Sequence, residues 1–339
     1  MKGLYKVLPP FAPDYGGACE VMYELGGMIL IHDASGCTVN YVHFDEPRYF
    51  TEPSAVFCSG LNEIDAVMGD DSVVIGKALK AAEKLHPKFI SFVGSSVPMV
   101  VGTDFKGLAA ECEAKCGIPC FGFAVNGIGT CMDGASKVYL EFIKRFSGDR
   151  TEAKGVNLLG LLPMSYSSVA ETEKVRSMFK YLRYSPGFMS TFENFSDLQN
   201  AEENVVVSSS GLEAADYMKK KYGIPYRIGI DYDEDYIRSI VGNVTSGKNV
   251  LVIGEGVEAC SFSDSLKKYG MVKAASVLDI FEQYDGAEYR LSDESEIKDV
   301  IGQFDVVVAD PYFKSLSENT EFINRPMIAV SGGAKCLPE

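Results

Sequence analysis

The sequence predicts an α/β protein of three Rossmann-like domains, each with a small parallel sheet flanked by helices. Short β-branched apolar runs alternate with helical stretches of about 10–15 residues, which is the pattern of βαβ units. The alternation restarts after the polar residues 147–154 and again after a helix expected at 234–241. We therefore expect an N-terminal domain at 1–150, a second domain at 151–242 and a third at 243–339.

A weak internal repeat also supports this organisation. Residues 115–120 read Lys-Cys-Gly-Ile-Pro-Cys, residues 221–226 read Lys-Tyr-Gly-Ile-Pro-Tyr, and residues 268–271 are a fainter echo. In each copy a Gly ends a helix and a short turn leads into a strand, as expected for α-to-β connections.

Three cysteines spaced four apart overlap the first copy of the repeat, namely Cys112, Cys116 and Cys120. Their counterparts in the second domain are Met218, Tyr222 and Tyr226. Because these counterparts are ordinary packing residues, we interpret the three cysteines as core residues rather than as a cluster motif.

The first domain is expected to begin with an extended arm at residues 1–18, which are rich in Pro and Gly. The elements expected after it are a helix at 20–27, a strand from 28, a polar aromatic loop at 41–53, a strand at 55–58, helices at 61–69 and 73–86, a strand at 89–93, a helix at 106–116, a strand at 120–125 and a helix at 136–146.

The same signals place the remaining elements. In the second domain we expect a strand at 156–162, a helix at 171–182, strands at 187–191 and 205–207, a helix at 212–222, a strand at 226–230 and a helix at 234–241. In the third domain we expect a strand at 249–253, a helix at 261–269, and strands near 274–278, at 306–309 and at 327–330.

Composition argues against several classes of function. The net charge of −15 argues against a nucleic-acid or anionic-membrane surface, since both need a basic face. The apolar runs stop well short of the ~20 residues of a bilayer span, and no signal peptide is recognised, so we expect a cytoplasmic protein. Nine cysteines in such a chain indicate thiols, metal ligands or catalysis rather than a disulfide framework.

The stretch 28–40 contains the cysteine on which the functional interpretation depends. Its apolar start is typical of a buried parallel strand, and Gly36 allows a tight turn that places Cys37 just beyond the strand's carboxyl end. Ligands bind at that edge of open α/β sheets. Cys19 precedes the strand and Cys58 ends the next apolar run, so the three thiols are candidate metal ligands. The alternative is that all three are small buried hydrophobic residues.

Polar side chains near this cysteine are candidates for catalysis. His32 and His43 flank it and could deliver protons at a redox site, although a structural role is the alternative for each. Asp45 belongs to a charged cluster that either forms surface ion pairs or contributes to partner docking or a proton relay.

A turn in the third domain fits the dinucleotide fingerprint G-x-G-x-x-A. Gly254 and Gly256 follow the strand at 249–253, and such a turn places a pyrophosphate on a helix N-terminus. However, Glu255 and Glu258 put negative charge where the phosphates would lie, so a turn without a ligand is the favoured interpretation. No G-x-x-x-x-G-K-[ST] nucleotide loop occurs in the sequence.

Three segments carry a resemblance to a known family. Gly-Ala-Cys at 17–19 and Ser-Gly-Cys at 35–37 are similar to the first two cluster cysteines of that family. Residues 59–69 resemble its Thr-Asp-Leu-x-Glu-x-Asp-x-Val-Phe-Gly segment, and residues 213–225 resemble a helix and turn of its second domain. The family comprises the α and β subunits of nitrogenase component 1 and relatives such as the dark-operative protochlorophyllide reductase. The resemblance runs through nearly the whole chain and implies the three-domain fold.

The chain departs from the family pattern at three places. Ser96 falls where the family has its third cluster cysteine. The loop that carries the cofactor-anchoring cysteine of nitrogenase is Ser-Ser-Ser here, beginning at Ser208, and the anchoring histidine would fall near Ser331. A nitrogenase-type cofactor would therefore lack both protein anchors, so we do not expect dinitrogen to be the substrate. We expect the substrate to bind in the cleft among the three domains, near Ser208 and residues 254–256.

The resemblance implies an iron–sulfur cluster, a [4Fe-4S] cluster, at a subunit interface. Such a cluster needs four ligands, and Cys19, Cys37 and Cys58 supply at most three, so two chains related by a two-fold axis would complete it. The partner would be an identical or a homologous subunit. Because the chain has no nucleotide loop of its own, electrons would come from an ATP-dependent iron-protein reductase.

The expected function is therefore a nitrogenase-like oxidoreductase subunit with an unknown substrate. A non-catalytic scaffold for metallocofactor assembly and a dinucleotide-dependent oxidoreductase are the alternatives.

Overall fold

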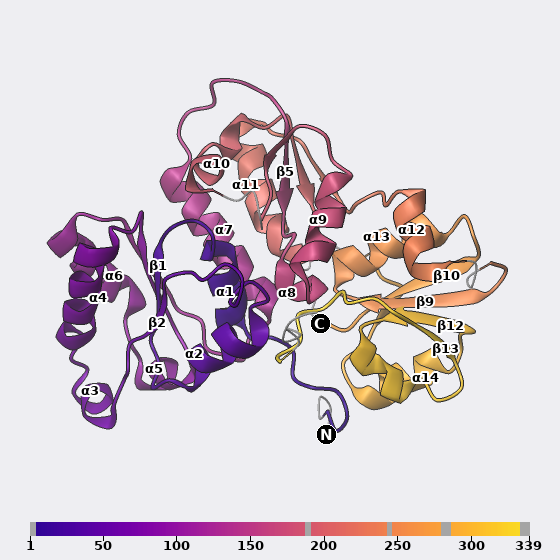
Figure 1. Ribbon diagram of the computed structural model, residues 1–339, viewed down its shortest axis with the longest axis horizontal. Helices are drawn as coiled ribbons and strands as arrows, with labels where there is room; N and C mark the ends of the chain where they lie inside the picture. Colours follow the sequence, from indigo (N-terminus) through magenta and orange to yellow (C-terminus); the bar gives the residue numbers. More distant parts are fainter. Residues whose placement is uncertain (1–4, 187–190, 243–245, 279–285, 333–339) are drawn as a thin grey trace.

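The computed structural model describes residues 5–186, 191–242, 246–278 and 286–332, and it contains three parallel sheets flanked by helices (Figure 1). The sheets follow one another along the chain, and we call each sheet with its helices the first, second or third sheet unit. The predicted α/β class with three small parallel sheets is confirmed. The domain boundaries near residues 150 and 242 remain a prediction.

The first sheet has the strand order β2-β1-β3-β4. Its strands are β1 (Met28–Ile31), β2 (Val56–Cys58), β3 (Ile90–Val93) and β4 (Cys120–Phe123). Its main helices are α1 (Asp14–Met22), α4 (Ser72–Leu85), α6 (Phe105–Cys116) and α7 (Cys131–Phe146). Leu30 and Phe92 are buried against α4 and α6 on one face, while α1 and α7 cover the face turned toward the rest of the molecule (Figure 1). Three short helices follow the strands' carboxyl ends: α2 (Gly36–Asn40), which continues into a π-helical turn (Tyr41–Asp45), α3 (Glu63–Met68) and α5 (Ser96–Val101).

The second sheet has the strand order β6-β5-β7-β8. Its strands are β5 (Val156–Leu159), β6 (Leu182–Tyr184), β7 (Glu203–Val206) and β8 (Tyr226–Ile228). Its helices are α8 (Pro163–Tyr166), α9 (Val169–Ser177), α10 (Phe192–Ser196) and α11 (Leu212–Tyr222). Helix α7 of the first unit packs against α10 and α11, so the two units share a continuous hydrophobic core.

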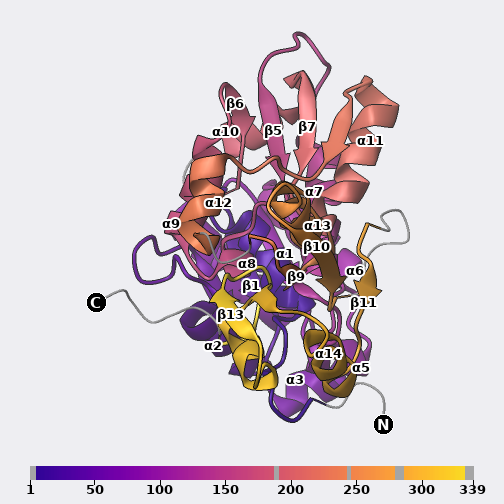
Figure 2. The same ribbon diagram turned by 90° about the vertical axis from the view of Figure 1, so that its right-hand side faces the viewer.

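The third sheet has the strand order β11-β10-β9-β12-β13. Its strands are β9 (Asn249–Gly254), β10 (Met271–Ser276), β11 (Tyr289–Arg290), β12 (Val306–Ala309) and β13 (Glu321–Asn324). Its helices are α12 (Glu234–Val241), α13 (Gly256–Leu266) and α14 (Glu294–Ile301). Figure 2 shows α13 and α14 on opposite sides of this sheet. Among the described residues, no helix is both long enough and apolar enough to cross a bilayer.

The predicted N-terminal arm is wrong from residue 14 onward, because these residues form α1. Two glycines, Gly17 of α1 and Gly134 of α7, are needed for the packing of these two helices. A Cβ at Gly17 would lie 1.9 Å from the carbonyl oxygen of Cys131, and a Cβ at Gly134 would lie 1.7 Å from that of Asp14. This close helix contact outweighs the poor helix propensity of glycine.

The last predicted strand, at 327–330, is also wrong. The final strand is β13, at the edge of the third sheet, whereas residues 327–330 are buried in irregular chain. They hold the N-terminal segment instead: the N–H of Ala12 donates to the carbonyl of Ala329 at 2.8 Å, and Phe11 forms an isolated bridge with Val330. Most of the strand predicted at 187–191 lies outside the described residues.

Candidate functional site

The carboxyl ends of β1, β2 and β3 meet at one edge of the first sheet. Ile31, the last residue of β1, pairs with Cys58 of β2 on one side and with Val93 of β3 on the other. The residues that follow these three ends therefore lie side by side, as the parallel register requires.

Asp33 follows β1 and connects the two cysteines of this edge. Its carboxylate accepts hydrogen bonds from the backbone N–H groups of Ser35 at 3.0 Å and Cys37 at 2.8 Å. Its main-chain carbonyl accepts a hydrogen bond from the Cys58 thiol at 3.2 Å. The N–H of Gly60 in turn donates to the Cys58 sulfur at 3.3 Å. Both half-buried thiols are thus positioned through one aspartate.

The Cys37 sulfur lies among hydrogen-bonding groups from two further segments. Burial and then the negative charge of Asp33 raise the pKa of Cys37, while hydrogen bonds from the Tyr15 and Ser95 side chains and from the Ser96 backbone lower it. Ser96, which the family resemblance aligns with the third cluster cysteine, therefore lies beside Cys37. A bound metal cation would reverse the net shift, since a coordinating thiol is deprotonated by the metal.

Cys19 lies in a more buried environment than the thiols of Cys37 and Cys58. It is fully buried within α1, and burial followed by the negative charge of Glu46 raises the pKa of its thiol. In the described part of the chain, the sulfurs of Cys19, Cys37 and Cys58 do not all come within 4.8 Å of one another. Metal binding by Cys19 stays a prediction, and the two cysteines that hydrogen-bond to Asp33 are Cys37 and Cys58.

The three predicted catalytic side chains lie in different environments. His32 is buried, its Nδ1 lies 2.9 Å from the hydroxyl of Ser59, and burial lowers its pKa. His43 is exposed, and its Nε2 lies 3.2 Å from a tyrosine hydroxyl. Asp45 is buried and accepts a hydrogen bond from the N–H of Gly332 at 2.7 Å, and burial raises its pKa to about 6. Their catalytic roles stay predictions.

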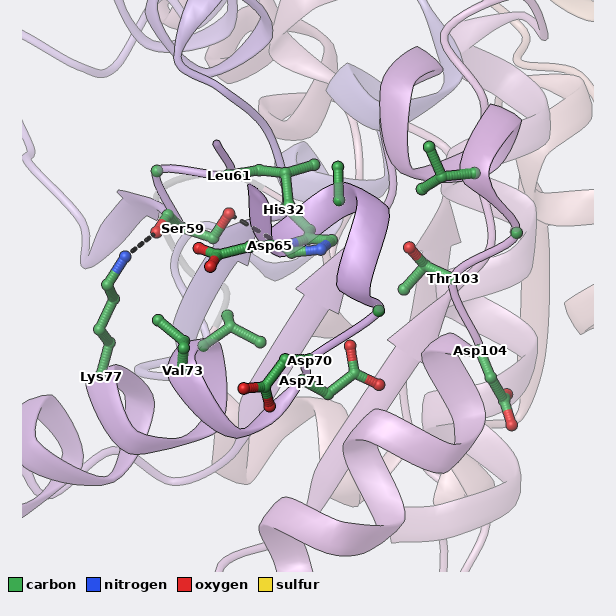
Figure 3. A pocket seen from close by; sticks show the side chains of 16 residues that line it. His32, Ser59, Leu61, Asp65, Asp70, Asp71, Val73, Lys77, Thr103 and Asp104 are labelled. Atoms are coloured by element: carbon green, nitrogen blue, oxygen red, sulfur yellow. Dashed lines mark hydrogen bonds between the residues drawn. The ribbon is translucent and has the colours of Figure 1, made fainter. Parts of the chain in front are cut away.

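His32 lines a cavity of about 130 Å³ beside the thiol edge (Figure 3). Its side chain and that of Asp65 lie near Ser59, whose main-chain carbonyl accepts a hydrogen bond from Lys77 at 2.7 Å. Further carboxylates line the cavity: Asp70, Asp71 and Asp104. This acidic lining would repel an anionic ligand.

An exposed apolar surface lies at the same edge of the first sheet. It is formed by α3 and α5, which contact each other, and by the loop after β4. We call it the apolar surface, and its members are Ile64, Val67, Met68, Val97, Val100 and Ile128. Val67 is 85% exposed and Val100 is 87% exposed. Contiguous exposed apolar side chains of this kind mark interaction sites.

The fingerprint turn of the third unit is filled by the side chain of Glu255. Its carboxylate accepts hydrogen bonds from the N–H groups of Val257 at 3.1 Å and Glu258 at 3.2 Å, in the first turn of α13. It also accepts one from the N–H of Ser209 at 3.0 Å. Donors at a helix N-terminus are those that a pyrophosphate would use. The geometry therefore argues against dinucleotide binding between Gly254 and Gly256.

Ser208 lies at the same junction of the second and third units. Its hydroxyl is 2.7 Å from that of Ser210, and both serines are buried. The hydrogen bond from Ser209, which lies between them in sequence, to Glu255 joins the carboxyl edges of the two sheets.

A cavity of about 600 Å³ lies where all three units meet. Its lining includes Pro47 from the first unit, Tyr166 from the second and Arg325 from the third. Arg325 is buried, and its Nη2 lies 3.1 Å from Glu258. The predicted residues Ser208, Gly254 and Gly256 do not line this cavity.

The structure brings together a second group of thiols that the sequence does not predict as a site. The repeat favours core residues for Cys112, Cys116 and Cys120, but their sulfurs all lie within 4.8 Å of one another. They lie near the amino end of β4, at the opposite edge from Cys37. The four-residue spacing of these cysteines is the sequence signal for a site. The second repeat unit obscures this signal, because its corresponding residues are not cysteines.

Comparisons with known proteins agree on one family. The family model described as nitrogenase component 1 type oxidoreductase matches residues 14–234. The nitrogenase molybdenum-iron protein beta chain of Methanothermobacter thermautotrophicus is 20% identical in an alignment of 298 residues, gaps included, which covers 74% of this chain and 62% of that protein. The nitrogenase iron-molybdenum cofactor biosynthesis protein NifE of Clostridium pasteurianum is 22% identical over 174 residues, 50% of this chain and 38% of NifE. The chain thus spans less than two thirds of the length of these relatives.

Solved structures show the same fold. A structure described as nitrogenase Cp1 at pH 6.5 superposes with a TM-score of 0.71 at 15% sequence identity. The superposition covers 98% of this chain and 91% of the other.

Proposed function

The chain belongs to the family of nitrogenase component 1 type oxidoreductases, and from this membership we propose that it is a subunit of a nitrogenase-like oxidoreductase that carries an iron–sulfur cluster at a subunit interface. The observation that carries the proposal is the pair Cys37 and Cys58, positioned together through Asp33 at the ligand-binding edge of the first sheet.

The chemistry of this edge fits a cluster. Thiolates are the usual ligands of iron–sulfur clusters, and hydrogen bonds to the sulfurs tune their potential. Backbone N–H groups of Ser96 and Gly60 already serve Cys37 and Cys58 in this way. Both thiols are half-buried, so a group bound there could contact a second chain. The cluster would supply one-electron transfer.

Two thiols per chain support a shared site. A [4Fe-4S] cluster normally takes four thiolates, so two chains that contribute Cys37 and Cys58 each would complete it. The apolar surface at the same edge would be covered by the partner, which is a second copy or a homologous subunit. An ATP-dependent iron-protein reductase would supply the electrons.

The substrate would bind in the cavity where the three units meet. Ser208–Ser210 and Ser331 stand where the family resemblance places the anchors of the nitrogenase cofactor, so the substrate is not dinitrogen. Ser96 would lie beside the cluster, and Cys19 is the alternative to Cys58 as the second thiolate of each chain.

A non-catalytic scaffold for metallocofactor assembly is the second candidate. It is favoured by the similarity to the cofactor biosynthesis protein NifE. Both candidates predict a bound cluster, but only the oxidoreductase predicts multiple turnovers with an ATP-driven reductase.

Iron and sulfide analysis with electron paramagnetic resonance tests the proposal on anaerobically reconstituted protein. Wild type should hold about two iron atoms per chain, one cluster per dimer. Cys37→Ser and Cys58→Ser should each lose or alter the cluster signal, whereas Cys260→Ser, in α13 of the third unit, should keep it. Iron-free wild type, or an unchanged signal in both edge variants, would contradict the proposal.

A further inference from the structure

The three sulfurs near the amino end of β4 are held close together by the local fold. Cys112 and Cys116 lie one turn apart on α6 and so share a face of that helix. Gly117, in the left-handed conformation with φ 70°, ends α6 and turns the chain back toward β4. Cys120 is the first residue of β4. The turn therefore brings all three sulfurs to one point, within 4.8 Å of one another.

Two contacts hold α6 tightly against β4. A Cβ at Gly122 would lie 1.8 Å from the carbonyl oxygen of Phe105, so glycine permits the close approach. The Glu113 carboxylate accepts a hydrogen bond from the N–H of Cys120 at 2.8 Å and pairs with Arg145 at 2.8 Å. Glu113 is therefore occupied in positioning the strand and is not a further ligand. The set consists of three sulfurs.

The separation of the sulfurs matches one metal ion rather than a cluster. At a Zn–S distance of ~2.3 Å, two thiolates on one tetrahedral ion lie about 3.8 Å apart. In an iron–sulfur cluster each thiolate binds a different iron, so the sulfurs are spread more widely. Soft thiolate ligands select zinc or cuprous ions among the common metals.

The site is also reachable from solvent. Cys112 is buried, but Cys116 and Cys120 are half-buried. Cys120 lines a groove of about 800 Å³ between α6 and α7, with Lys106 and Lys137 at its border. An ion can enter along this groove, which a workable metal site requires.

We propose that Cys112, Cys116 and Cys120 form a binding site for a single thiophilic metal ion, Zn²⁺ or Cu⁺, separate from the iron–sulfur edge. Three thiolates leave one position of a tetrahedral ion open to water or to an incoming ligand. The site does not depend on Cys37 or Cys58 and stands whether or not the proposed function is correct.

Cobalt titration of the reduced full-length protein tests the proposal. The background is the double variant Cys37→Ser/Cys58→Ser, so that the edge thiols contribute nothing. One equivalent of Co²⁺ should produce a sulfur-to-cobalt charge-transfer band, and Zn²⁺ should displace it. Cys116→Ser and Cys120→Ser should weaken binding at least about tenfold, the loss that removal of even an outer-shell partner causes. The matched control Cys260→Ser should leave the band unchanged.

Circular dichroism identifies a variant that fails to fold. Cys116→Ser lies at a half-buried helix end, so it should keep the fold even if Cys120→Ser does not. A reduced, folded protein without the band overturns the proposal, and so does a band that survives in both variants. A Cys112–Cys120 disulfide that forms in air, with no cobalt binding after reduction, also overturns it, since the thiols would then be a redox pair.

Discussion

The thiol of Cys58 donates a hydrogen bond of 3.2 Å to the main-chain carbonyl of Asp33. The carboxylate of the same aspartate holds the N–H of Cys37, so one residue after β1 positions a thiol from each of two adjacent strand ends. The aspartate also places a negative charge close to the Cys37 sulfur.

Asp33→Asn should make Cys37 more reactive. The charge of Asp33 raises the pKa of Cys37, so a neutral amide should lower that pKa and increase the thiolate fraction at pH 8. The amide oxygen can still accept the hydrogen bonds from residues 35 and 37. Alkylation of Cys37 in the metal-free protein, followed by peptide mass spectrometry, should be several-fold faster. Cys116 in the same sample is the internal control, and equal rates at Cys37 in both proteins would refute the prediction.

Val100→Glu should weaken subunit association. Val100 is the most exposed member of the apolar surface, and a carboxylate there would place like charges against an interface built around apolar contact. Sedimentation velocity should show a dissociation constant raised by at least about tenfold. Met271→Glu, also strongly exposed but on β10 of the third unit, should leave association intact. If only Met271→Glu disrupts the dimer, the interface lies elsewhere.

The stability of the protein should fall as pH rises from about 4.5 to 8. Burial raises the pKa of Glu20 to about 8, and it raises the pKa of Glu258 to about 7 and that of Asp45 to about 6. The folded protein therefore keeps protons that the unfolded chain has released, and the free energy of unfolding decreases with pH across this window.

Glu20→Gln isolates the largest of these contributions. Its amide oxygen can still accept the hydrogen bond of 2.6 Å from the N–H of Met164. Thermal unfolding should show a smaller loss of Tm between pH 6 and 9 than wild type, with higher stability at the alkaline end. Glu141→Gln, on the exposed face of α7, should keep the wild-type slope. Parallel slopes for Glu20→Gln and wild type would count against a buried proton on Glu20.

Two glycine variants should shift stability in opposite directions. Gly17→Ala places a methyl group against the Cys131 carbonyl and should destabilise the protein by about 1–3 kcal/mol through overpacking. Gly76→Ala lies inside α4, where a Cβ meets no atom within 4 Å, and should stabilise it by about 0.5–1 kcal/mol. Urea unfolding measures both. A harmless Gly17→Ala would mean that α1 can move away from α7 at little cost.

The sequence predicts what depends on strand order and misses what depends on packing between distant segments. The neighbourhood of Cys37, Cys58 and Ser96 could be expected, because carboxyl ends of parallel strands meet at one edge. The setting of Cys19 could not. It lies on α1, whose two glycines are a local loop signal, and the need for Gly17 is explained only by its contact with α7.

Packing between distant segments also explains the wrong prediction near the C-terminal end of the described chain. Residues 327–330 are apolar enough for a strand, but their burial serves the contact with residues 11 and 12, which sequence distance conceals. β13 has exposed residues at both ends, as an edge strand can, so its apolar signal is weak. In the cysteine triad, the turn after Gly117 brings Cys120 back to α6, a geometry that residue spacing alone does not reveal.

The Glu255 side chain competes with any anionic ligand for the N–H groups at the start of α13. Its carboxylate is tethered at the N-terminus of α13, so it meets those N–H groups at a high effective concentration that dilution cannot lower. A free phosphate must displace the Glu255 carboxylate before it can bind. The hydrogen bond from the N–H of Ser209 to this carboxylate raises the free-energy cost of that displacement. The helix end should therefore bind a free phosphate more weakly than an unoccupied helix N-terminus would.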